Sequence, residues 1–117
     1  MVGFWMTEIE IIPDNDNVYR RIPRVWYIET ENRPSSAAFR DPETSVDWSK
    51  YSTPEESLKG YSGYFLASIK AKIPREMKLD VIHRPSKNNH SHSVILGQKT
   101  PSKAKSLADR SVIVKKP

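Results

Sequence analysis

The sequence predicts an α+β fold: one small domain, residues 1–117, built on a mainly antiparallel sheet with two short helices. Short segments rich in β-branched and aromatic residues alternate with turn residues, a pattern typical of antiparallel strands. Two Thr-Pro pairs stand where short helical patterns begin. The length of 117 residues suits a single domain that buries roughly two-thirds of the surface its unfolded form exposes.

The first half of the chain contains three short strand candidates. Residues 8–12 and 24–29 are rich in β-branched or aromatic side chains, and residues 45–48 are predicted as a short edge strand. Residues 13–17 combine a proline with Asp and Asn residues and are predicted as a turn. Residues 37–40 fit neither the helical nor the strand period.

Both helices are predicted from signals at their first residues. Thr53 can act as N-cap, Pro54 suits the first helical position, and Glu56 can complete a capping box. Glycines follow soon afterwards, so this helix should be short. The pair Thr100–Pro101 repeats the cap before a second helix over 102–110, where apolar residues fall at helical spacing.

Residues 65–73 form the strongest strand pattern. Their odd-numbered positions are all apolar, whereas positions 68, 70 and 72 are polar. This period of two predicts Ile69 in the core and Lys70 and Lys72 on a solvent face. Further strands are predicted at 79–83, 93–96 and 111–114, followed by a frayed tail at 115–117.

Charge is distributed unevenly along the chain. Residues 1–60 carry 7 basic and 11 acidic side chains, a net charge of −4. Residues 61–117 carry 12 basic and 3 acidic ones, a net charge of +9. An acidic half followed by a basic half predicts a surface that attracts phosphates or an acidic partner from one side.

The leading functional hypothesis is therefore a small non-enzymatic accessory protein. Its basic half would dock onto an acidic protein partner or nucleic acid within a larger assembly. Exposed aromatic residues such as Tyr61 and Tyr64 would stack on unpaired bases. The cations expected to carry this binding are Lys70, Lys72, Lys99, Lys103, Lys105, Arg110, Lys115 and Lys116.

Composition limits the remaining possibilities. The chain has no cysteine, which excludes disulfide-linked partners, thiolate catalysis and Cys-ligated zinc. Its longest apolar runs are only a few residues, too short for a membrane span, and its first residues lack the basic start of a signal peptide. A cytoplasmic location is the resulting expectation.

A small enzyme that acts on a nucleotide or phosphodiester is the alternative. His83, His90 and His92 lie close together in the sequence, and a His-x-His pair on a strand would place both rings on one face. We expect no metal or other cofactor, because few carboxylates accompany these histidines. A cleft shared with Arg20 and Arg24 would favour the enzyme, whereas a smooth basic face would favour docking.

Two enzyme families share fragments of this pattern. Arg20 and Arg24 followed by Ser35 loosely resemble the Arg and Ser that hold the nicotinamide nucleotide in ADP-ribosyltransferases, although the late catalytic Glu of that family has no counterpart here. The stretch His90-Ser91-His92-Ser93 is only loosely similar to half of the paired 2H phosphoesterase signature and has no second copy, so this resemblance fails.

A broader resemblance covers most of the chain. The stretches RPSSAAF at 33–39 and SVD at 45–47, followed by residues 92–97 and 103–108, are similar to a group of short, uncharacterised prokaryotic proteins. This resemblance implies no activity.

Overall fold

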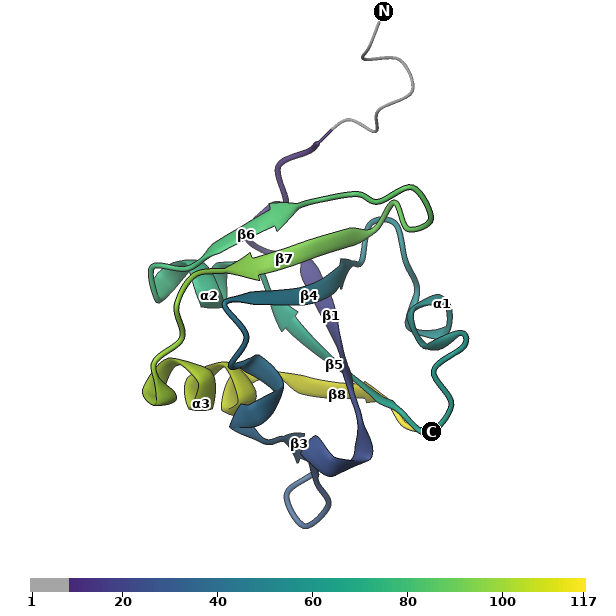
Figure 1. Cartoon of the computed structure of the whole chain (residues 1–117), viewed down its shortest axis with the longest axis vertical. Coiled ribbons are helices and arrows are strands. Elements are labelled where there is room, and N and C mark those ends of the chain that lie inside the picture. The colour runs from purple at the N-terminus through teal and green to yellow at the C-terminus, as the bar shows by residue number, and fades with distance from the viewer. Residues whose placement is uncertain (1–8) are drawn as a thin grey trace, which may run out of the picture.

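Six antiparallel strands form the sheet at the centre of the computed structural model, which describes residues 9–117 (Figure 1). Their spatial order is β6-β7-β4-β1-β5-β8. The strands are β1 (Asn17–Ile22), β4 (Glu43–Trp48), β5 (Phe65–Lys70), β6 (Asp80–His83), β7 (His92–Leu96) and β8 (Val112–Lys115). A separate small hairpin pairs β2 (Tyr27–Ile28) with β3 (Arg33–Pro34).

Three α-helices and two 3-10 turns complete the fold of the described residues, 9–117. The helices are α1 (Pro54–Leu58), α2 (Lys72–Glu76) and α3 (Pro101–Arg110), and the 3-10 turns are η1 (Arg24–Trp26) and η2 (Ser36–Phe39). The α+β class and the antiparallel sheet are confirmed. The local signals for two helices are confirmed as well: Thr53 and Glu56 form a capping box at α1, and the Thr100 side chain caps α3.

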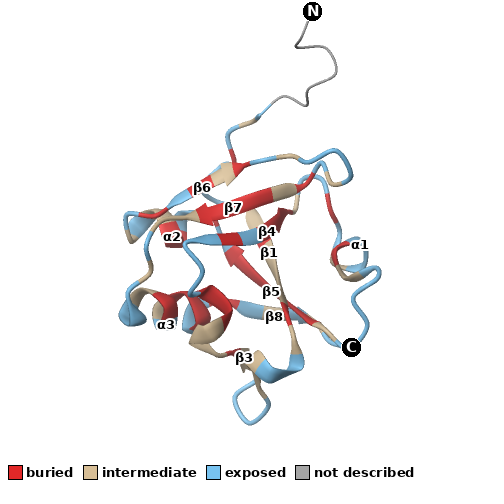
Figure 2. Ribbon diagram, in the orientation of Figure 1, coloured by how far each residue is buried: buried red, intermediate tan, exposed pale blue. Residues whose placement is uncertain are grey.

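The main core lies on the face of the sheet that α3 and η2 cover (Figure 2). Trp48 and Phe39 are its largest buried side chains. Ile69 is 3% exposed, as its place in the alternating pattern predicts. The helix α3 contributes small residues and one leucine to this core: Ala104, Leu107 and Ala108.

The long alternating strand is shorter than its pattern suggests. β5 ends at Lys70, because the backbone N–H groups of Ala71 and Lys72 bond to Asp16 and Asp14 and the chain turns into α2. Lys72 therefore belongs to a helix and does not share a strand face with Lys70. Leu66, on the face opposite Ile69, is fully buried because α1 packs on that side of β5.

Several expectations for the first half were wrong. Residues 45–48 belong to β4, which lies inside the sheet between β7 and β1 and not at its edge. Residues 24–29 form η1 and a two-residue strand of the hairpin. Residues 9–12 form no strand, while Glu8 lies outside the described residues. Strand β1, which the sequence pattern missed, occupies 17–22.

The last strand reaches one residue further than expected. Lys115 is the last residue of β8 and pairs with Leu66 of β5, so it is not part of a frayed tail. Strands β6, β7 and β8 otherwise confirm the three predicted strands to within one residue at each end. Within residues 9–117, no helix is long and apolar enough to cross a membrane.

Candidate functional site

Folding mixes the two charge halves of the sequence. Cations of the second half pair with acids of the first half: Arg75 with Asp14 at 2.7 Å, Arg84 with Glu43 at 2.8 Å, and Lys115 with Glu55 at 3.8 Å. The division between an acidic and a basic half is therefore much weaker in space than in sequence.

The predicted binding cations are spread over several elements. Lys70 ends β5, Lys72 is in α2, and Lys103, Lys105 and Arg110 are on α3. On α3, Lys105 pairs with Asp109 at 2.7 Å and Arg110 with Glu76 at 3.4 Å. Lys115 is the last residue of β8 and Lys116 follows it, next to the C-terminus that Figure 1 marks on the side away from α3.

The ammonium group of Lys99 is used for hydrogen bonds within the protein. Its Nζ donates to the carbonyl oxygens of Asp41, Pro42 and Ile95 at 2.7, 3.1 and 2.5 Å. Burial lowers the pKa of Lys99 to about 8, against the opposing attraction of Asp41. The side chain thus ties the turn before β4 to β7.

The arginines and serine of the enzyme alternative have separate surroundings. Arg20 donates to the carbonyl oxygens of Ala38 at 2.9 Å and Ser45 at 3.0 Å, and burial lowers the pKa of Arg20. It bridges β1 and β4 where their ladder, which covers only two residue pairs, has ended. Arg24 is exposed in η1, and Ser35 precedes η2 with its backbone N–H bonded to Trp26.

His83 is fully enclosed at the edge of the core. Its Nδ1 accepts the backbone N–H of Glu10 at 3.0 Å, so Nε2 carries the proton that is donated to the carbonyl of His90 at 2.8 Å. Its exposed fraction is 1%. Because both ring nitrogens are engaged, His83 has no lone pair left for a metal or a substrate.

The His-x-His interpretation was wrong. His92 is on β7, where Nδ1 bonds to the Arg84 carbonyl at 2.8 Å and Nε2 is 3.5 Å from the Ser45 hydroxyl. His90 precedes the strand and its exposed ring packs edge-on against Tyr51, with centroids 4.2 Å apart. Among residues 9–117 no group of three His, Asp or Glu side chains could hold a metal ion.

A pocket of about 410 Å³ nevertheless joins the arginine-rich strand to the histidine loop. Arg21 of β1 and His90 both line it, together with residues of β4, α1 and the loops that follow β4 and β6. We call it the Asp47 pocket, after the carboxylate in its lining. A cleft shared by these two segments is the feature expected to favour the enzyme alternative, but Arg21 lines it and not Arg20 or Arg24.

A buried polar network organises this pocket. Asp47 is 2% exposed and accepts hydrogen bonds from Arg21 Nη2 at 2.7 Å, Ser57 Oγ at 2.7 Å and Asn89 Nδ2 at 2.9 Å. Arg21 Nε also donates to the Ser57 carbonyl at 2.6 Å. With its oxygens occupied, Asp47 is a positioning group and has little capacity left as a general base.

Aromatic and basic side chains gather at the end of the sheet where β1 and β8 end and β5 begins. Tyr27 stacks on Phe65 with centroids 3.7 Å apart, and the Arg24 guanidinium lies 5.5 Å from the Phe65 centroid. A hollow of about 390 Å³ is lined by these three residues and Lys116, among others.

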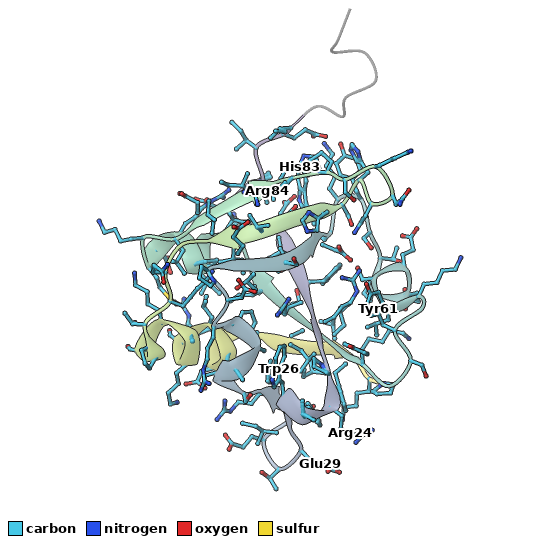
Figure 3. All side chains as sticks on the ribbon, in the orientation of Figure 1. Arg24, Trp26, Glu29, Tyr61, His83 and Arg84 are labelled. Carbon is cyan, nitrogen blue, oxygen red and sulfur yellow. The ribbon has the colours of Figure 1, made fainter. Side chains whose placement is uncertain are left out.

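The loop between α1 and β5 adds tyrosines to the same end. Tyr61 and Tyr64 meet edge to face at 5.4 Å, and Tyr61 is 42% exposed. In the common view of Figures 1 and 3, the C-terminus lies between the labelled Arg24 and Tyr61. We call this surface the basic–aromatic end; it consists of Arg24, Tyr27, Tyr61, Tyr64, Phe65, Lys115 and Lys116.

Comparisons with protein-family models, curated proteins and solved structures found no match for this chain.

Proposed function

We propose that this protein is a non-enzymatic module that binds single-stranded nucleic acid through its basic–aromatic end. The observation that carries the proposal is the hollow in which Arg24 and Lys116 accompany the stacked rings of Tyr27 and Phe65. Residues from three separate parts of the chain form this hollow, so no contiguous motif in the sequence indicates it.

The chemistry of this end matches the two requirements of single-strand binding. Such proteins combine cations that follow the phosphate backbone with aromatic rings on which unpaired bases stack. Here Arg24 and Lys116 supply positive charge in a hollow that Glu29 also lines. The 42% exposed Tyr61, over whose ring the Arg21 guanidinium lies at 4.2 Å, supplies the remaining ring surface. Stacking of one base on an accessible ring contributes about 1–3 kcal/mol and is tolerant of base identity.

Two contrasts favour this end over the remaining cations. Lys105 and Arg110 on α3 are paired with acids, and Lys99 is directed at backbone carbonyls. At the basic–aromatic end Lys115 is paired with Glu55, but Arg24 and Lys116 form no ion pair within residues 9–117. The aromatic rings favour nucleic acid over an acidic protein partner, because carboxylates gain charge contacts from lysines but do not need exposed rings.

The experiment measures binding of a fluorescent oligouridine of about ten nucleotides by anisotropy at several salt concentrations. A single-stranded ligand loses about 0.7 in the slope of log K against log salt for each phosphate contact removed. Arg24→Ala, Lys115→Ala and Lys116→Ala combined should therefore reduce the slope by about 2. Tyr61→Ala should weaken binding at every salt concentration alike.

The matched control is Lys103→Ala with Lys105→Ala, which removes charge from α3 at the opposite side of the sheet. An equal reduction of the salt slope by this control would show general attraction and overturn the proposal. A protein that binds poly-glutamate more tightly than oligouridine would overturn it in favour of an acidic protein partner.

A further inference from the structure

The Asp47 pocket presents two kinds of polar group. Groups of the first kind are already hydrogen-bonded within the protein. Asp47 accepts from its three donors, and Glu56 Oε1 accepts the backbone N–H of Thr53 at 2.9 Å in the capping box. Tyr51 is committed as well, since its hydroxyl bonds to Glu10. The two acids of the lining are thus engaged by the protein itself.

Groups of the second kind are hydrogen-bond donors that remain free to bind a ligand. Within residues 9–117, the side chains of Lys59 and Asn88 take part in no ion pair or hydrogen bond, and His90 has only ring contacts with Tyr51 and His83. Arg21 uses Nε and Nη2 on protein acceptors, which leaves Nη1 as a further donor. These donors come from β1, the end of α1 and the loop between β6 and β7.

Hydrogen bonds to Asp47, to His83 and within the turn fix the loop that carries Asn88 and His90. Asn89 donates to Asp47 and accepts from the Ser91 backbone N–H at 3.1 Å and hydroxyl at 2.5 Å. Backbone bonds between Ser86 and Asn89 close the turn, and His83 donates to the His90 carbonyl. The backbone that carries Asn88 and His90 is thereby positioned before a ligand arrives, which lowers the entropic cost of binding.

We propose that the Asp47 pocket binds a phosphate monoester group. A phosphate offers three terminal oxygens, and an ammonium, a guanidinium N–H, an amide and an imidazole are donors that suit them. The volume of about 410 Å³ exceeds that of the phosphate alone and leaves space for the organic part of the ester. This site shares no lining residue with the basic–aromatic end, although the Arg21 guanidinium lies 4.2 Å from the centroid of the Tyr61 ring, and it does not depend on the function of that end.

The test is an NMR titration of the isotope-labelled full chain with inorganic phosphate, uridine monophosphate and uridine. Phosphate and the monophosphate should shift the Asn88 side-chain amide and the His90 ring signals saturably, and uridine should not. Lys59→Ala should weaken the affinity at least tenfold. Lys87→Ala, which removes the same charge from the same loop as Asn88 but outside the pocket lining, should change it less than twofold.

Three outcomes would overturn the site: no saturable shift with either phosphate, equal losses in the Lys59 and Lys87 variants, or an equal response to uridine. The phosphate could belong to the 5′ end of a nucleic-acid strand or to a free phosphate ester. Comparing a 5′-phosphorylated oligonucleotide with its unphosphorylated form distinguishes these two sources. If neither form binds the pocket although uridine monophosphate does, the ligand is a free phosphate ester and not a strand terminus. Equal binding of both forms would also overturn the site, because the unphosphorylated form carries no monoester. The variant lacking Arg24, Lys115 and Lys116 should retain phosphate binding, so failure of the nucleic-acid proposal leaves this one testable.

Discussion

Replacement of Asp47 by alanine should be among the most destabilising changes in the chain. The substitution removes three hydrogen bonds, one of them from the partly buried Arg21, whose side chain is 21% exposed. Removing one partner of a buried ion pair costs about 3–5 kcal/mol, because the other charge stays buried without compensation. Since Arg21 retains some water and its bond to the Ser57 carbonyl, we expect about 3 kcal/mol, at the lower end.

Urea unfolding followed by circular dichroism measures this loss. The matched control is Glu43→Ala, which also breaks a carboxylate–arginine pair, at 2.8 Å with Arg84, but with side chains that are 62% and 46% exposed. An exposed pair contributes about 0–1 kcal/mol. Arg21→Met should largely suppress the effect of Asp47→Ala in a double-mutant cycle. Equal losses for Asp47→Ala and Glu43→Ala would refute the reasoning that burial of the network makes it important.

Two further predictions concern the core and Lys99. Ile69→Ala should cost about 2–5 kcal/mol in a urea melt through lost burial and a residual cavity, whereas Lys70→Ala should stay within about 0.5 kcal/mol; equal effects would show that the face assignment of β5 is wrong. The pKa of Lys99, lowered from 10.5 to about 8, means that the folded state binds fewer protons than the unfolded state between these pH values. The unfolding free energy, taken relative to Lys99→Met, should therefore rise with pH across this window, and a flat difference would mean that the three carbonyl acceptors offset the burial.

Features that depend on local chemistry could be predicted from the sequence. The caps at Thr53 and Thr100 act over three residues, so both helices that they begin were found. Strand β1 was not predicted because Arg20 and Arg21 place a charged residue on each of its two faces. The segment therefore lacks the alternation of apolar and polar residues that is typical of a strand inside a sheet. The acceptors of these arginines, such as Ser45 and Asp47, lie more than twenty residues further along the chain.

The candidate sites were only partly accessible to sequence reasoning. The sequence indicates nucleic-acid binding by Lys115, Lys116, Tyr61 and Tyr64, but the meeting of Lys116 with Arg24 in one hollow depends on the pairing of β8 with β5. Asp47 gave one weak signal, a carboxylate between Val46 and Trp48 in an apolar strand. Its partners from α1 and the loop after β6 could not be identified without the sheet order.

The ion pairs that join the two charge halves have a consequence for the denatured chain. Before folding, an N-terminal segment of net −4 is linked to a C-terminal segment of net +9, so the two ends of the same polymer attract each other. This attraction compacts the denatured ensemble at low salt, and it fades once the Debye length falls to about 3 Å near 1 M salt. Ionic strength therefore acts on the starting point of folding as well as on the native ion pairs, and the m-value of a urea titration reports the former. The native pair of Asp14 with Arg75 thus joins two segments whose opposite net charges already attract each other in the denatured chain.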